Sequence, residues 1–152
     1  YKLSITLFLS ELTLHVVHHE PINEPLFDYV FHSIEWLDSC NDNFANFHLV
    51  YMIHLLRFLG IYPNLDDYVS GCYFDMRNGY YVRTLPLHGQ FLTIEDTALV
   101  ATLARMDYAN MHLFKLSRAE RNRFCDIVLH YYALHLPKFP EIKSLAVLRD
   151  LF

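Results

Sequence analysis

Histidines gather near the end of the first helix that the sequence predicts. His15, His18 and His19 stand three and four residues apart, and Glu20 follows them. On a helix this spacing places two imidazoles on one face, where they could share a metal ion. A zinc site normally needs about four ligands, with thiolates or carboxylates close by. We therefore favour a solvated helix end and expect no bound metal. A metal-dependent hydrolase that uses this histidine-rich surface is one alternative.

The cysteines give no metal or disulfide signal. Cys40, Cys72 and Cys125 are odd in number and far apart in sequence, which argues against a disulfide scaffold. Cys72 has no second thiol at the short spacing of a zinc knuckle, so a structural role is expected. Reduced thiols suit a cytoplasmic protein.

Catalytic motifs are missing from the sequence. It contains no Gly-x-Ser-x-Gly turn, no glycine-rich phosphate loop and no His-Glu-x-x-His pair. The acidic pairs Asp66-Asp67 and Glu95-Asp96 fall in a loop and at a helix start, where solvation and capping account for them. We expect a non-enzymatic protein with no catalytic residues and no cofactor.

Basic side chains are the stronger functional candidates. Lys115, Arg118 and Arg121 lie close together on the outer face around a helix start at Ser117. Such a group could bind phosphates or an acidic peptide, although a solvated polar face also accounts for it. Arg57 lies on an otherwise apolar helix, where pairing or snorkelling is the ordinary explanation and a functional groove the alternative. These four residues are the candidate contacts for a partner peptide or DNA.

Helical periodicity dominates the elements that must position these residues. Ile5, Phe8, Leu9, Leu12 and Val16 form one stripe of the first helix, and Leu3, Leu7 and Leu14 form a second. The second stripe implies another neighbour, which could be a segment before Tyr1 or a second copy of the chain. A purely structural helical dimer is therefore the third hypothesis. Asn23 begins the next helix, which should run to about Cys40 with a buried side of Phe27, Val30, Ile34 and Leu37.

The stretch from Asn46 to Gly60 is apolar in every sector, so it should be the enclosed centre of the bundle, ending at Gly60. Asn78-Gly79 lies between aromatic-rich runs and predicts a type I′ hairpin at about residues 72–84. Later helices begin at Thr93, with Leu99, Leu103 and Met106 inside, and at the Ser117/Glu120 capping box. The inner positions of the Ser117 helix are Phe124, Ile127, Val128, Tyr131 and Leu134, and those of a short final helix are Ile142, Leu145, Leu148 and Phe152.

Composition supports one all-α domain, a helical bundle with that small β-hairpin insertion. The 152 residues are 53% hydrophobic, enough for a substantial core, and no apolar run reaches the ~20 residues of a membrane span. The formal net charge of −5 gives no global attraction to nucleic acid. We expect no membrane partner. The chain begins with Tyr inside a helical pattern, so we expect it to be a domain of a longer protein.

The order of motifs resembles the C-terminal helical region of the bacterial DNA-repair protein family RecO, in its Bacteroides-like form. The resemblance is carried by "NEPLFDYVFHSIEWLD", by "NFHLVYMIHLLRFLGIYPNLDDY", and, after a β-like insertion, by "LSRAERNRFCDIVLHYYALHLPKFPEIKSLAVL". It covers nearly all of residues 1–152. The turn "RFLGIYPNL" and the ending "YYALHLPKFPEIKSL" are its most specific parts.

This resemblance implies a recombination mediator that loads recombinase and anneals strands. It implies an N-terminal OB-fold before Tyr1 that carries most DNA contacts, and it implies RecR and the acidic tail of single-stranded-DNA-binding protein as partners. Many family members carry a four-cysteine zinc module where this chain has only Cys72, so zinc binding is not expected here. The domain should then be a docking scaffold, with an apolar groove edged by basic side chains for the acidic tail.

Overall fold

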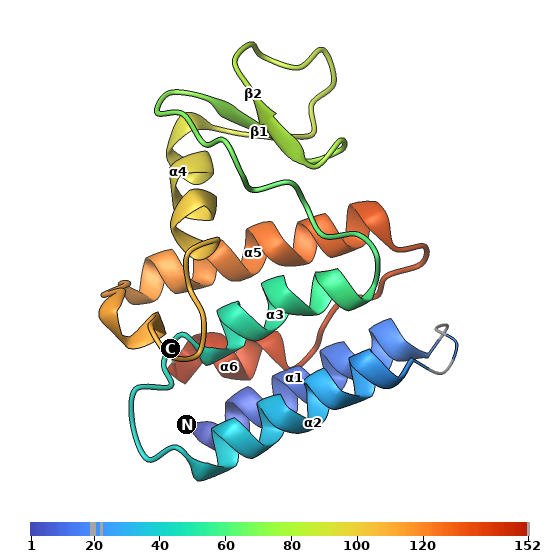
Figure 1. The fold of residues 1–152 in the computed structure, drawn as a ribbon, viewed down its shortest axis with the longest axis vertical. Coiled ribbons are helices and arrows are strands. Elements are labelled where there is room, and N and C mark those ends of the chain that lie inside the picture. The colour runs from blue at the N-terminus through green and yellow to red at the C-terminus, as the bar shows by residue number, and fades with distance from the viewer. Residues whose placement is uncertain (19–20, 22, 152) are drawn as a thin grey trace.

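The protein folds around a bundle of helices with a small sheet at one end (Figure 1). The structure, a computed structural model, describes residues 1–18, 21 and 23–151. Its helices and strands are α1 Lys2–Val17, α2 Glu24–Ser39, α3 Phe47–Phe58, β1 Tyr73–Asp75, β2 Tyr80–Val82, β3 Phe91–Leu92, α4 Ile94–Leu103, the 3-10 turn Met111–Leu113, α5 Arg118–His135 and α6 Leu145–Leu151. Within the described residues, none of these helices combines the length and apolar character needed to cross a membrane.

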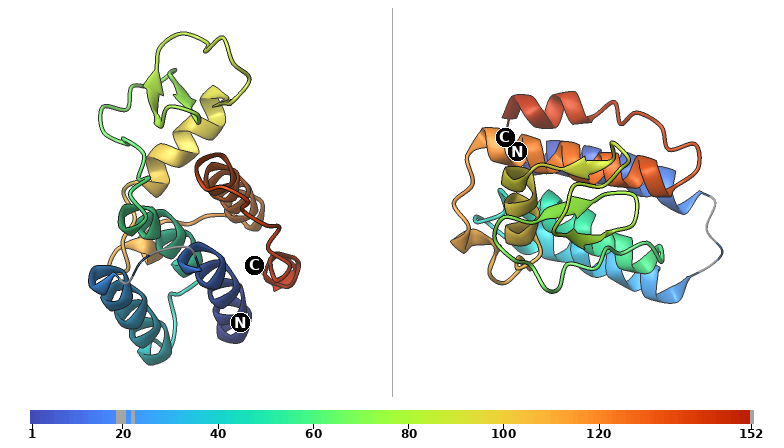
Figure 2. Two further views of the ribbon diagram at one scale, coloured as in Figure 1. Left: turned by 90° about the vertical axis from the view of Figure 1, so that its right-hand side faces the viewer. Right: turned by 90° about the horizontal axis from the view of Figure 1, so that it is seen from above.

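Helix α3 is the centre of the bundle, as its all-round apolar pattern predicts. Nine of its residues from Phe47 to Leu56 are buried. Figure 2 shows α1 and α2 on one side of α3, with α4 and the sheet on the other. Gly60 ends the helix with φ +73°, and the amide of Ile61 donates to the carbonyl of Leu56 at 3.2 Å. The left-handed glycine therefore terminates α3 as expected.

Both stripes of α1 are present. The first stripe, from Ile5 to Val16, is buried in the core. Leu3, Leu7 and Leu14 of the second stripe are exposed. Among the described residues, the second stripe therefore faces away from the core.

The expected buried side of α2 is wrong at two of its four positions. Phe27 and Ile34 are exposed, whereas Leu37 is buried as expected and Val30 is half-buried. Leu26 and Ser33 are buried instead. Ser33 can be buried because the Tyr108 hydroxyl donates a 2.8 Å hydrogen bond to its Oγ. A partner supplied by a distant segment removes the desolvation penalty of that serine, and Phe27 and Ile34 face outward. The cap by Asn23 Oδ1 on the amide of Leu26, at 3.2 Å, is confirmed.

The β insertion is a three-stranded antiparallel sheet of order β2-β1-β3, more than the hairpin at about residues 72–84 that the sequence predicts. The β1–β2 connection also differs from a type I′ turn. Asp75 pairs with Tyr80 across four loop residues, and Gly79, but not Asn78, has positive φ. The Asp75 carboxylate accepts from both the amide and the side chain of Asn78, at 2.9 and 2.8 Å, which fixes this longer loop.

Capping signals locate the later helices correctly. Thr93 Oγ1 accepts from the amide of Asp96, and Ser117 and Glu120 form the reciprocal capping box of α5. Leu134 is 37% exposed, so it is not part of the inner face; Tyr132 is buried instead and donates to the carbonyl of Met52 at 2.7 Å. Ile142 and Leu148 are buried as expected. Phe152 lies outside the described residues.

Candidate partner-binding grooves

One groove lies between the α2–α3 loop and the segment that leads into α5. We call it the basic groove. Its volume is about 450 Å³, and its charged lining residues are Lys115 and Arg121, with no Asp or Glu among the described residues that line it. The remaining lining residues are Asn43, Ala45, Asn46, Met111, His112, Phe114, Leu116 and Ser117. An apolar floor beside two cations is the chemistry that binds an acidic peptide with an apolar anchor.

Asn46 holds the floor of the basic groove in place. Its Nδ2 donates to the carbonyl of Met111 at 3.0 Å and to that of Phe114 at 2.9 Å, and the residue is 5% exposed. These two bonds fix the 3-10 turn against the start of α3. Sequence reasoning missed this role, because Asn46 stands where an ordinary helix cap is expected and its partners are more than sixty residues away.

Arg121 is anchored at the edge of the basic groove. Its Nη1 donates to the carbonyl of Leu116 at 2.6 Å. Partial burial lowers the pKa of its guanidinium, while Cys125 and Glu120 raise it, and an arginine stays charged at neutral pH. Arg121 also helps to lower the pKa of His48 to about 3, although burial of that imidazole is the larger cause. The Arg121 cation is therefore positioned by the backbone.

The four basic residues chosen from the sequence separate into three places. Lys115 and Arg121 line the basic groove. Arg118 points to α6, where its Nε and Nη2 donate to the carbonyl of Arg149 at 3.0 and 2.5 Å. Arg57 is near the opposite end of α3, with its guanidinium 4.5 Å from the ring centroid of Tyr62 and Nη2 donating to the hydroxyl at 3.2 Å. The structure brings two of the four together.

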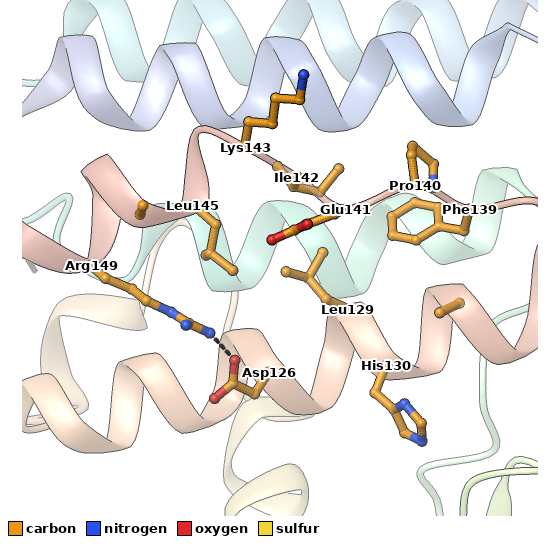
Figure 3. Close-up of a pocket in the computed structure, with 12 residues that line it drawn as sticks. Asp126, Leu129, His130, Phe139, Pro140, Glu141, Ile142, Lys143, Leu145 and Arg149 are labelled. Carbon is orange, nitrogen blue, oxygen red and sulfur yellow. Dashed lines mark hydrogen bonds and ion pairs between the residues drawn. The ribbon is translucent and has the colours of Figure 1, made fainter.

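A second groove of about 420 Å³ runs between α5 and α6 (Figure 3). We call it the α5–α6 groove. Figure 3 shows Leu129, Phe139 and Leu145 along it and an ion pair between Arg149 and Asp126 at one end. Lys143 and Glu141 also line it. Its cations are thus matched by carboxylates, which makes it the poorer binding site for an acidic peptide.

The histidine cluster gives no metal site in the described part of the chain. His15 lies 3.9 Å from a carboxylate oxygen of Glu11, and that carboxylate also accepts hydrogen bonds from the amides of Lys143 and Ser144. The backbone and hydroxyl hydrogen bonds lower the pKa of Glu11 against the raising effect of burial. His19 and Glu20 lie outside the described residues. Among those that are described, no group of three His, Cys, Asp or Glu residues is placed to hold a metal ion.

Comparison with known proteins gives a consistent family signal. The family model described as "Recombination protein O C terminal" matches residues 1–146. Proteins named DNA repair protein RecO are 52% identical in Phocaeicola vulgatus over all of this chain, 49% identical in Bacteroides fragilis, and 43% identical in Azobacteroides pseudotrichonymphae. The chain spans 63% of the length of each of these relatives. No solved structure matches it significantly.

Proposed function

We propose that this chain, which belongs to the family of RecO C-terminal domains, is a non-catalytic docking domain for DNA repair and homologous recombination. Its relatives are named as DNA repair proteins. In this proposal the domain binds recombination proteins and single-stranded-DNA-binding protein, and so supports recombinase loading and strand annealing. DNA contacts belong chiefly to the part of the relatives that this chain does not span. The net charge of −5 supports that division, because a phosphate-binding surface is normally basic.

The basic groove is the proposed site for the acidic tail of single-stranded-DNA-binding protein. The observation that carries this assignment is the pair Lys115 and Arg121 beside an apolar floor in a lining without carboxylates. An acidic tail needs an anchor pocket for its apolar side chains and cations for its carboxylates. Lys115 supplies an exposed charge, while Arg121 supplies one that is held by the carbonyl of Leu116. RecR is the second proposed partner.

Titration of a fluorescently labelled acidic peptide tests the assignment. The expected result is saturable binding that weakens as salt is added, because exposed ion pairs are screened. Lys115→Glu combined with Arg121→Glu should weaken binding by at least about tenfold, the effect of losing about 1.4 kcal/mol. Arg77→Glu with Arg83→Glu changes the net charge equally at exposed positions in the β1–β2 loop and just after β2, and should have little effect. Equal loss in both double variants would mean that only net charge matters, and the basic groove would be rejected.

The α5–α6 groove supplies a second control. Arg149 of α6 lines it, and Arg118 lies next to it, where its Nε donates to the carbonyl of Arg149. Arg118→Glu should leave peptide affinity within about twofold of the wild-type value if the peptide binds in the basic groove. A loss from Arg118→Glu as large as that from the Lys115 and Arg121 double variant would move the site to the α5–α6 groove.

A further inference from the structure

A third groove lies between α1 and α2, and its lining is more apolar than that of the basic groove or the α5–α6 groove. Its volume is about 530 Å³. Both helices rest against α3, and Phe47 and Tyr51 of α3 contribute to the groove lining. Leu9, Leu14 and Val17 line one wall, and Val30, Ile34 and Leu37 line the other. Figure 2 shows α1 and α2 diverging from α3 on this side of the molecule. We call this feature the α1–α2 groove.

Exposed apolar side chains extend both walls outward. Leu14 is 62% exposed and Ile34 is 57% exposed, although both line the groove. Helical spacing places Leu3 and Leu7 beside Leu14, and Phe27 and Phe31 beside Ile34. The rings of Phe27 and Phe31 stack with centroids 6.1 Å apart. Two facing apolar rims above an apolar groove are more than scattered surface hydrophobics and mark an interaction site.

The charge next to these rims is acidic. Helix α2 carries four exposed carboxylates, Glu24, Asp28, Glu35 and Asp38. Lys2 is the only Lys or Arg in α1 and α2, and its Nζ already donates to the backbone carbonyls of Asp38 and Cys40. This contact bridges α1 to the end of α2 and closes one end of the groove. Positive charge that complements the carboxylates of α2 must therefore come from the molecule that occupies the groove.

We infer that the α1–α2 groove binds a basic amphipathic helix of a protein partner. Apolar side chains of that helix, spaced three and four residues apart, lie between the two rims, and its Lys or Arg side chains meet the carboxylates of α2. A second copy of this chain fits less well, because an α2-to-α2 contact would set four carboxylates against four without added cations. This inference is independent of the acidic-peptide site, since the two grooves differ in place and in sign of charge.

A designed peptide tests the inference on the 152-residue chain. Helix α1 has 16 residues, so a probe of about 16 residues matches the groove length at about 1.5 Å per residue. The probe carries Leu at helical spacing on one face and Lys on the other, with a fluorescent label. A second probe replaces every Lys by Glu, and a third has the first composition in scrambled order. The expected result is saturable binding of the first probe and at least about tenfold weaker binding of the other two.

Surface variants locate the bound probe. Phe31→Ser with Ile34→Ser removes two exposed apolar side chains, and Asp28→Lys with Glu35→Lys reverses two exposed charges of α2. Each double variant should weaken binding by at least about tenfold. The matched control is Asp66→Lys with Glu141→Lys, which makes the same charge change at exposed positions elsewhere. It should leave affinity within about twofold.

Four results would overturn the inference. Equal binding of the scrambled probe, or equal loss in the Asp66 and Glu141 control, would reduce the effect to general charge attraction. A dimer in light scattering that dissociates in the Phe31 and Ile34 double variant would assign the groove to a second copy. Probe binding by this chain but not by the longer Phocaeicola vulgatus relative would assign the groove to the additional part of that protein.

Discussion

Replacing Asn46 by alanine is expected to destabilise the protein and to disorganise the basic groove together. The buried Nδ2 group makes two hydrogen bonds, to the carbonyls of Met111 and Phe114. Each is a neutral side-chain to backbone bond with a net contribution of about 1 kcal/mol. Loss of both should lower the free energy of unfolding by about 2 kcal/mol. For a domain of this size that corresponds to a decrease in Tm of about 4 to 8 °C.

Intrinsic fluorescence gives a direct assay for Asn46→Ala. Trp36 is the only tryptophan, and it stacks on Phe47 and Tyr108 with ring centroids 5.5 and 5.4 Å away. Its emission should therefore change when the bundle unfolds in urea. Asn122→Ala on α5 is the matched control, because Asn122 is not among the residues that line the basic groove and alanine favours a helix.

The Asn46 variant also has a binding readout. Without the two bonds, the segment that carries Phe114 and Lys115 is no longer fixed against α3, so affinity for the acidic peptide should fall under conditions where the variant is folded. A change in unfolding free energy below about 0.5 kcal/mol, the usual size for a surface substitution, would refute the reasoning. If the variant shows the expected loss of stability but binds the peptide with unchanged affinity, Asn46 does not organise the groove for peptide binding.

Three further predictions concern stability. Gly60→Ala should lower the free energy of unfolding by about 1 kcal/mol, because the position has φ +73°. A Cβ there would meet no atom within 4 Å, so the cost comes from the backbone conformation alone. An unchanged urea midpoint would contradict this cost. Ser117→Ala should also cost about 1 kcal/mol by removing the cap of α5, with Ser70→Ala as a neutral comparison. Burial, with Arg121, holds the pKa of His48 at about 3, so only the unfolded chain takes up a proton near pH 6.5. Stability from neutral His48 should therefore fall by about 2 kcal/mol between about pH 7 and pH 5, and His48→Leu should lack this loss; parallel pH profiles would contradict it.

Local signals in the sequence were sufficient for most helix boundaries. Asn23, Thr93 and Ser117 cap helices as expected, and Gly60 ends α3, because each depends on residues only three or four positions away. The enclosure of α3 also followed from composition alone, since a helix without a polar face has to be covered.

The face of α2 could not be predicted in this way. Helix α2 has two faces that could be buried. The more apolar face, with Phe27 and Ile34, is exposed, and the face with Ser33 is buried. The outcome depends on hydroxyl partners that come from elsewhere: Tyr108 bonds Ser33, and the Tyr29 hydroxyl donates to the carbonyl of Tyr51 at 2.9 Å. A pattern of hydrophobic residues cannot show that Ser33 is buried, because the group that hydrogen-bonds to it lies 75 positions away in the sequence.

The candidate site was partly predictable for a similar reason. Lys115 and Arg121 stand out as cations close in sequence, and they do line one groove. The direction of Arg118 depends on the end of α6, and the role of Asn46 depends on the 3-10 turn. The third strand, Phe91–Leu92, has two residues and therefore too little alternation to be recognised.

The most direct test of the docking account is to map where an acidic tail peptide binds on the isotope-labelled chain by NMR. The account predicts that the amide shifts that change on titration cluster at residues 43–48 and 111–121, around Lys115 and Arg121, and that these changes disappear when both residues are replaced by Glu. Shift changes confined to residues 126–149 of the α5–α6 groove, or the absence of any saturable change, would contradict it.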